Sequence, residues 1–467
     1  MDFTLLRFEW VLIGIIVVLL VGKLTDIDKK PYFIPLINLL LVVNILLGFV
    51  PMPHGEAFGN FFRTNSLIAF EKNILNIALL LISVMGNEWL KKTTVQAEHY
   101  ILLLTSMLGI FLMLSSTHIL PFYLGLEMST IPLAALANFE MSSQKSSEAG
   151  IKLILSSAFS TAIMLFGISL LYGVSGSLYF NDLANAMQSQ PLHLAAFIFF
   201  ISGVFFKMSV VPFHLWTADV YEGAPTAVTN YLASISKAAI VFVLFNVLFK
   251  IFGHLQEGWT LIVSLLAILS MTIGNLFALR QENIKRLLAF SSISQVGYIL
   301  VAYIGFSPHS LGAVFYFIIV YLLSNITAFG VVSIVESTTG RVTLDAYKGL
   351  YHRFPTYALF MAIALFSLAG IPPTAGFFGK LFLLTAGIQP MYYWVLVVAA
   401  INLILSLYNY LRIVRIMFIE NGENRIESIS TNRLILVTMA TCVLLILAFS
   451  FFPQVYQWGI AWYGFVR

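Results

Sequence analysis

Apolar runs long enough to cross a membrane recur from Phe8 to Phe452, with short polar breaks between them. A bilayer core of ~30 Å needs about 20 residues of α-helix to cross it. Of the 467 residues, 60% are hydrophobic and only 10% are charged, which is too few charges to cover a soluble protein. The runs lack the alternating pattern of an outer-membrane barrel. The sequence therefore predicts an all-α polytopic membrane protein.

Run lengths and polar breaks together predict about fourteen spans. Their centres are near Val17, Leu41, Leu79, Leu108, Glu127, Met164, Gly203, Lys237, Leu265, Val296, Ile319, Ile371, Leu403 and Leu444. No strand is expected, and therefore no phosphate-binding glycine loop that follows a strand.

The chain contains a single cysteine, Cys442, in the last predicted span. One thiol cannot form an internal disulfide, and it cannot hold an iron–sulfur cluster, which needs several thiolates. No spacing of metal ligands is visible. We therefore expect no cofactor or metal in this chain and no nucleic-acid partner, with any redox or nucleotide chemistry in other subunits.

Basic residues are concentrated in alternate predicted loops, and these loops contain Lys29, Lys30, Lys91, Lys92, Lys145, Arg280, Lys285, Arg286, Arg341, Lys348, Arg353, Arg412, Arg415, Arg425 and Arg433. The positive-inside rule makes these loops cytoplasmic. An even number of spans then places both termini on the other side, which is the periplasm in a bacterium.

Proline interrupts two predicted spans near their centres, at Pro212 in the seventh and at Pro372 and Pro373 in the twelfth. Proline breaks a helix, and broken backbone inside a membrane survives only where protein or water surrounds it. Each break falls in the fourth helix of a five-helix unit. Because five is odd, the two units are inverted, an arrangement typical of ion transporters. Two unrelated kinks are the alternative.

This reading divides the chain into four parts. We expect an N-terminal three-helix segment over 1–97, inverted five-helix repeats over 98–250 and 259–419, and a loop with the last helix over 420–467.

Four charged residues lie deep within predicted spans: Glu127, Lys207, Lys237 and Lys380. A charge at the bilayer centre costs ~2.5–3.5 kcal/mol or more, and it is tolerated beside water or a partner. A structural ion pair could explain any one of them. Four together, two of them on broken spans, favour a proton relay. We expect Glu127 and Lys207 to face each other, because each is alone in an apolar run, where an unpaired ion would be costly. The carboxylate would then change how firmly the lysine holds its proton.

Two further residues are secondary relay candidates. His214 titrates near physiological pH and could pass protons, although it could equally be a packing residue. Lys152 lies two turns inside the sixth span, where it could relay protons or extend to the membrane surface. Asp219 and Glu222 follow the broken seventh span and could line the cytoplasmic mouth or cap the next helix.

Residues 211–226, VPFHLWTADVYEGAPT, closely resemble the seventh-helix signature of the N-type antiporter-like subunits of bacterial respiratory complex I. Further segments that resemble this family are LGLE at 124–127, EAGIK at 148–152, SKAA at 236–239, PPTAGFFGK at 372–380 and YNYLRIVRIM at 408–417. The resemblance implies a fourteen-helix, proton-translocating membrane subunit of NADH:quinone oxidoreductase. It gives the relay roles of the fifth, seventh, eighth and twelfth helices to Glu127, Lys207, Lys237 and Lys380.

The same resemblance implies the setting of the chain. NADH, FMN, iron–sulfur clusters and quinone would be bound by partner subunits. The partners would be the M-type antiporter-like subunit and small membrane subunits, in the lipid bilayer of the bacterial inner membrane.

Two alternatives remain open. The chain could be a cation/proton antiporter subunit of a multi-subunit Na⁺/H⁺ antiporter, although residues 220–226 look like the N-type family. The M-type sister is expected to carry glutamate in place of Lys380. A structural spacer in the membrane arm would leave the deep charges unexplained.

Overall fold

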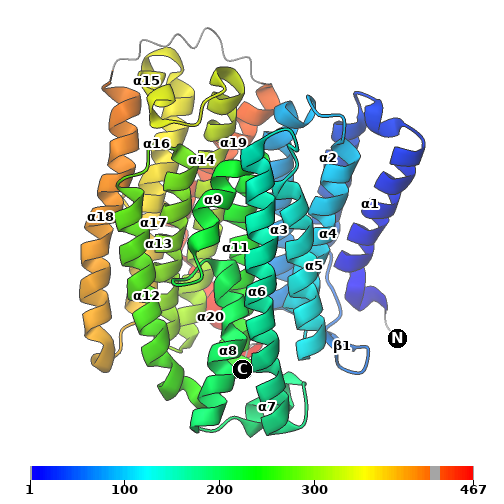
Figure 1. Cartoon of the computed structure of the whole chain (residues 1–467), viewed down its shortest axis with the longest axis vertical. Helices are drawn as coiled ribbons and strands as arrows, with labels where there is room; N and C mark the ends of the chain where they lie inside the picture. Colours follow the sequence, from blue (N-terminus) through cyan, green and yellow to red (C-terminus); the bar gives the residue numbers. More distant parts are fainter. Residues whose placement is uncertain (1–2, 421–431, 466–467) are drawn as a thin grey trace.

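Long α-helices run side by side along the vertical direction of Figure 1 and make up most of the chain. The computed structural model describes residues 3–420 and 432–465. The predicted loop before the last helix, with Arg425, lies largely outside the described residues.

The helices formed by the apolar runs are α1 (Arg7–Leu24), α2 (Phe33–Gly48), α3 (Ser66–Leu90), α4 (Gln96–Ser115), α5 (Ile119–Ala137), α6 (Gln144–Ser175), α8 (Pro191–Met208), α10 (Thr226–Tyr231), α11 (Lys237–Lys250), α12 (Gln256–Ala278), α13 (Ile284–Ile304), α14 (Pro308–Thr339), α16 (Pro355–Ala369), α17 (Ala375–Ala386), α18 (Tyr393–Phe418) and α19 (Arg433–Ala448). Shorter helices are α7 (Phe180–Ala186), α9 (Leu215–Gly223), α15 (Leu350–Arg353) and α20 (Gln454–Ala461). A π-helical turn, Leu232–Ser236, joins α10 to α11. Single 3₁₀ turns lie at Phe3–Leu6, Ile27–Lys29, Gly253–Leu255, Leu344–Tyr347, Pro390–Tyr392, Phe449–Phe451 and Trp462–Phe465.

The prediction of about fourteen spans is confirmed. Within the described residues, 12 helical segments are long and apolar enough to cross a membrane. The shorter apolar helix α2 and the interrupted pair α16 and α17 supply the other two crossings.

One expectation was wrong, because the structure contains strands. A short antiparallel hairpin of β1 (Gly55–Ala57) and β2 (Phe62–Thr64) lies in the loop between α2 and α3. Gly59 and Asn60 in its turn both have positive φ angles, 64° and 66°, which these residue types tolerate. Three-residue strands give too little alternation to be recognised in a sequence.

Both predicted interruptions occur where the prolines lie. The chain leaves α8 through Ser209 at φ 65° and leaves α16 through Gly370 at φ 83°, so each helix ends in the left-handed conformation. Freed backbone groups find side-chain partners: Val211 N donates to Ser270 Oγ at 3.1 Å, and Trp216 Nε1 donates to Phe206 O at 3.1 Å. These hydrogen bonds stabilise the first broken segment inside the bundle.

Corresponding helices of the two five-helix units pack in the same way. In the first unit α4 packs on α5, where a Cβ atom on Gly109 would lie 2.5 Å from Ser129 N. In the second unit α12 packs on α13, where a Cβ atom on Gly297 would lie 2.8 Å from Ala267 O. Glycine is required at both contacts because the backbones touch. The boundaries at 98–250 and 259–419 stay a prediction.

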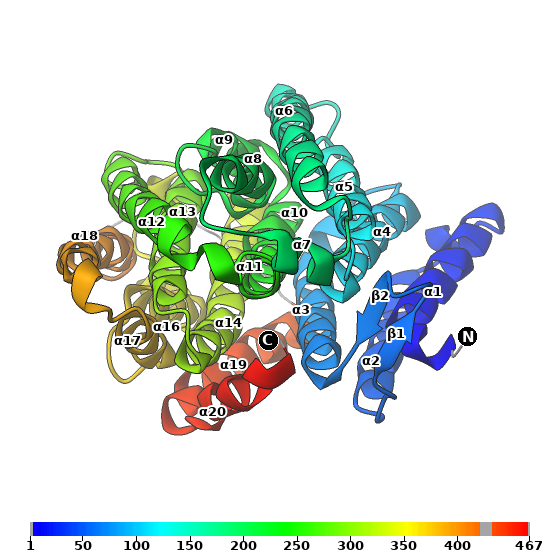
Figure 2. The same cartoon turned by 90° about the horizontal axis from the view of Figure 1, so that it is seen from below.

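The residues of the spans made by α10 with α11 and by α13 are all buried among other helices, whereas only about a third of the residues in the most apolar part of α6, α18 and α19 are buried. Figure 2, which looks along the helices, shows α11 near the middle of the bundle. Lys237, which begins α11, thus lies on one of the two spans best shielded from lipid.

Candidate functional site

The amine of Lys207 lies at the end of α8, directly before the first helix break. It donates to the hydroxyls of Ser129 and, at 2.9 Å, of Thr130 on α5. Both hydroxyls in turn donate to Leu126 O at 2.7 Å. Lys207 is buried, and its partners are neutral oxygens.

Lys237 begins α11, directly after the π-helical turn, and is 2% exposed. Its amine donates to Ser292 Oγ on α13 at 2.5 Å and lies 5.6 Å from the centre of the Tyr221 ring. Ser292 Oγ donates to Ala289 O at 2.7 Å. The hydroxyl therefore stands in the same relation to its lysine as Ser129 does to Lys207.

Lys380 lies in α17, beyond the second break, and reaches back toward it. Its amine donates to Ala369 O at the end of α16, at 3.2 Å, and lies 4.7 Å from the ring centre of Tyr298 on α13. The carbonyl at the end of a broken helix carries partial negative charge, which stabilises an ammonium group. Lys380 is also buried.

Two groups of hydrogen-bonded polar side chains lie near the three lysines. Between Lys207 and the central helix, Ser106 Oγ donates to Ser129 O at 2.9 Å, and Tyr231 OH on α10 donates to Ser106 Oγ at 3.2 Å. The sequence analysis did not identify Ser106 or Tyr231.

A second polar group lies between Lys237 and Lys380. Gln295 Nε2 on α13 donates to Tyr410 OH at 2.9 Å and to Leu368 O at 3.0 Å, and Ser291 bonds to the same Tyr410 hydroxyl. The sequence analysis missed these residues as well. The sequence feature that could have identified Ser291 and Gln295 is the largely polar stretch at 291–295, SSISQ, inside an otherwise apolar span.

Glu127 does not form an ion pair with Lys207 within 4 Å in the described structure, although the two lie within electrostatic range. Its carboxylate accepts a hydrogen bond from Tyr123, and it lies on the partly exposed face of α5 with Leu124 and Ile131. The mutual dependence of Glu127 and Lys207 stays a prediction. It would have to act across a gap that Ser129 and Thr130 border.

Lys152 belongs to a network of ion pairs at the upper end of the bundle. It contacts Glu148 at 2.6 Å and Asp219 at 2.5 Å. Arg286 also contacts Asp219, at 2.6 Å, and Glu222, at 2.9 Å. With its side chain 40% exposed, Lys152 is not enclosed as Lys207 is, and its relay role stays a prediction.

His214 lies in the broken segment between α8 and α9. It is buried, and neither ring nitrogen has a hydrogen-bond partner among the described residues. Its relay role is likewise still a prediction.

The structure also buries several charged residues near helix ends that are not among the four predicted to lie deep. Lys72 on α3 pairs with Glu9 on α1 at 2.5 Å, and both are buried. Glu71 is 1% exposed, although it lies only five residues into α3. Lys285 at the start of α13 donates to Ala224 O at 2.8 Å. Distance along a helix is thus a poor measure of depth where loops cover its end.

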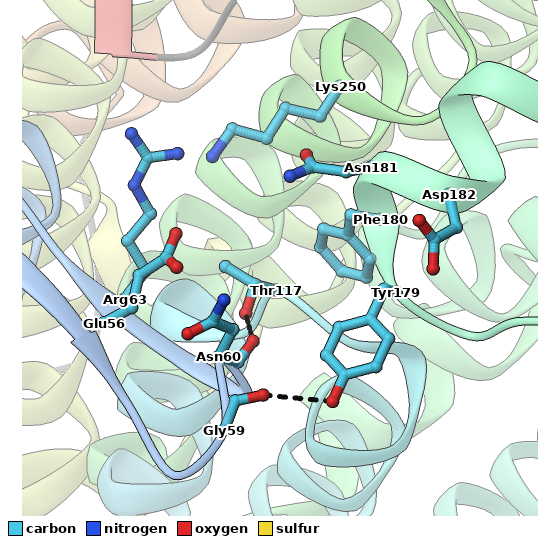
Figure 3. A pocket seen from close by; sticks show the side chains of 10 residues that line it. All are labelled: Glu56, Gly59, Asn60, Arg63, Thr117, Tyr179, Phe180, Asn181, Asp182 and Lys250. Atoms are coloured by element: carbon cyan, nitrogen blue, oxygen red, sulfur yellow. Dashed lines mark hydrogen bonds between the residues drawn. The ribbon is translucent and has the colours of Figure 1, made fainter.

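A polar cleft of ≈ 290 Å³ opens at the lower end of the bundle, beside the hairpin (Figure 3). Glu56 and Arg63 from the strands and Lys250 from the end of α11 extend into it. Tyr179 OH donates to Gly59 O at 3.0 Å and ties the hairpin to the loop before α7. Lys250 is thus the lower, water-accessible end of the helix that begins with Lys237.

Within residues 3–420 and 432–465, no group of three or more histidine, cysteine or acidic side chains is placed to hold a metal ion. The candidate site consists of buried amines, hydroxyls, an amide and backbone carbonyls. Such groups exchange protons and hydrogen bonds.

Residues 116–406 match the family described as NADH:quinone oxidoreductase/Mrp antiporter, TM. NADH-quinone oxidoreductase subunit N of Phocaeicola vulgatus is 42% identical over 433 residues, covering 92% of each chain. Subunit N of Azobacteroides pseudotrichonymphae is 41% identical over 465 residues, covering 98% of this chain and 97% of the relative.

Solved structures agree with these matches. A chain of respiratory complex I from Thermus thermophilus superposes with a TM-score of 0.81 at 28% identity, over 96% of this chain and 97% of that one. A chain of the Mrp complex from Dietzia sp. has a TM-score of 0.84 at 19% identity. The match covers 99% of this chain and 97% of that one, which shows a shared fold. This chain therefore belongs to the NADH-quinone oxidoreductase subunit N family, the antiporter-like membrane subunits of complex I.

Proposed function

We propose that this chain translocates protons in the membrane arm of NADH:quinone oxidoreductase, through Lys207, Lys237 and Lys380. The observation that carries the proposal is the environment of these amines. All three are buried, and within the described residues none has a carboxylate within 4 Å. A structural lysine would be held by a buried acid, as Lys72 is held by Glu9.

Hydroxyl partners suit a lysine that changes its protonation state. Ser292 now accepts a hydrogen bond from Lys237 and donates one to Ala289 O. If Lys237 became neutral, rotation of the hydroxyl would let Ser292 donate to the amine nitrogen instead. Ser129 and Thr130 can do the same for Lys207. A carboxylate could only accept, and it would favour the charged lysine alone.

Protons would enter from the end of the bundle at which α6 and α13 begin, because the ion pairs of Lys152, Asp219 and Arg286 lie there, and this end would be cytoplasmic. Both termini would then be periplasmic. The chain would act as a non-redox subunit of the translocase. The driving reaction would take place in partner subunits that bind NADH, FMN, iron–sulfur clusters and quinone, and the M-type subunit and small membrane subunits would be its neighbours.

Transport of Na⁺ by the same path is the second candidate, since the matched family includes Mrp antiporters. A hard cation such as Na⁺ prefers oxygen ligands, and a buried ammonium group repels it. The three amines therefore favour protons.

The test is replacement of Lys237 in the assembled complex. Lys237→Ala should reduce quinone-linked NADH oxidation and proton uptake in vesicles severely while the complex still assembles on a native gel, because the central titratable group is lost. Lys237→Arg should fail as well, because guanidinium stays charged at any working pH.

Lys91→Ala is the matched control, since Lys91 is exposed and its ion pair among the described residues is with the exposed Glu88. Full activity with the full proton stoichiometry in Lys237→Ala would contradict the proposal and support a structural spacer. Pumping that requires Na⁺ would support the antiporter candidate.

A further inference from the structure

A membrane-facing groove of ≈ 640 Å³ runs between α3, α14 and the C-terminal helices α19 and α20. Figure 2 shows these helices together on one flank of the bundle, opposite α8 and α9. The lining is almost entirely apolar, with Ile77 and Leu81 from α3 and Ile326 from α14 among its residues. Along α3 the groove extends from Phe70 to Leu81, about 16 Å at the helical rise per residue.

The lower end of this groove adjoins a pocket of ≈ 240 Å³ whose lining mixes apolar residues with a few polar ones. Phe49, Phe70 and Asn73 line both cavities, so the two lie side by side. The pocket adds His54 and Ser66, which bond to each other at 2.9 Å. An apolar groove within the spans therefore adjoins a site with polar groups at their edge.

The polar end is suited to an anion. Ser66 is the first residue of α3, and the N-terminus of a long helix attracts phosphate. Arg7 donates to Val50 O on the rim of the pocket at 2.6 Å and places a cation beside it. None of the described residues that line the pocket is acidic.

Asn73 gives a second indication of a ligand. It is 6% exposed and lies where the two cavities meet, yet its Oδ1 atom has no hydrogen-bond partner among the described residues. A buried amide without a partner is costly. Asn73 follows Ser66 by about two turns into the membrane. An ester carbonyl at that depth cannot donate to Oδ1, but it can accept a hydrogen bond from the Nδ2 group of the same carboxamide.

We infer that the groove and pocket hold one phospholipid. Its phosphate lies at the first turn of α3 beside His54 and Ser66, its ester groups lie near Asn73, and one acyl chain fills the groove. Trp458 lines the groove and Trp462 the pocket, which matches the preference of tryptophan for the membrane interface. The site lies apart from the lysines, so the inference does not depend on proton transfer.

Photo-crosslinking in the whole complex tests this inference. Benzoylphenylalanine would replace Ile77 in the groove, and Leu81 would provide a second groove position if that variant did not assemble. The matched control is Leu20 on α1, which is apolar and exposed. Illumination would follow exhaustive exchange into detergent, and mass spectrometry would identify the adduct.

We expect a phospholipid adduct at the groove position after exchange and only detergent at Leu20. Replacing both His54 and Ser66 by alanine should reduce the phospholipid adduct several-fold. An adduct with another protein subunit, or loss of lipid at both positions alike, would overturn the inference. If replacing His54 and Ser66 by alanine left the amount of phospholipid adduct unchanged, the placement of the phosphate at these residues would be wrong.

Discussion

Ser292→Ala should impair proton transfer at Lys237 without removing the lysine. In the described structure Ser292 Oγ, at 2.5 Å, is the hydrogen-bond partner recorded for this amine, which otherwise has only the Tyr221 ring. A hydrogen bond to a charged group contributes about 1.5–3 kcal/mol, and one between neutral groups about 0.5–1.5 kcal/mol. When Lys237 is charged, the variant would lose the stronger hydrogen bond to a charged group. When Lys237 is neutral, it would lose the weaker hydrogen bond between neutral groups.

The balance between the two states would thus change by the difference, about 1–1.5 kcal/mol, or roughly 5- to 10-fold in the equilibrium. We expect coupled NADH oxidation to fall by up to this factor, as measured in membrane vesicles together with proton uptake and a native gel for assembly. Ser292→Thr keeps the hydroxyl and should retain most of the activity.

Ser294→Ala is the matched control. Ser294 is two residues away on α13, is fully buried, and has no hydrogen-bond partner for its hydroxyl among the described residues. The coupled NADH oxidation and proton uptake of this variant should remain close to those of the unsubstituted complex. If Ser292→Ala assembled and pumped at the normal rate and stoichiometry, or if Ser294→Ala were equally damaged, the role given to the Ser292 hydroxyl would be refuted.

Two further predictions concern the other lysines. Lys380→Glu should give an assembled complex with partial activity, because a protonated glutamate can donate to Ala369 O in place of the amine, and loss of the distal membrane subunits on a native gel would instead identify an assembly contact. Glu127→Gln should lower coupled activity, and the double variant with Lys207→Ala should be little worse than the more damaging single change, whereas additive losses would show that the two residues act independently.

The spans and helix breaks could be predicted because each depends on local chemistry. An apolar run of spanning length has few alternatives to a membrane helix, and Pro212 and Pro372 exclude continuous helices wherever the rest of the chain lies. The depth of Lys207, Lys237 and Lys380 followed from their position within such runs. Those parts needed no knowledge of which helices are neighbours.

The partners of the lysines could not be predicted, because they depend on the rotation and packing of different helices. Ser292 contacts Lys237 across 55 positions of sequence, and Tyr410 reaches Gln295 across 115. A serine or tyrosine in a span can also satisfy its hydroxyl on its own helix, so its presence says little about a network. Glu127 shows the same limit: its central position was correct, but it faces Tyr123 at a partly exposed surface and has no direct bond to Lys207.

The comparison of Lys72 with the central lysines shows that the sequence does not reveal which group lies beside a buried charge. Lys72 and Lys237 are equally enclosed, yet Lys72 has the carboxylate of Glu9 at 2.5 Å and Lys237 has only a hydroxyl at the same distance. An ammonium group beside a carboxylate is stabilised in its charged form, and removing either partner leaves an uncompensated charge. Beside a hydroxyl that can donate or accept, both protonation states are satisfied. Depth alone therefore selects candidates for proton transfer, and the chemistry of the nearest oxygen separates a relay from a structural ion pair.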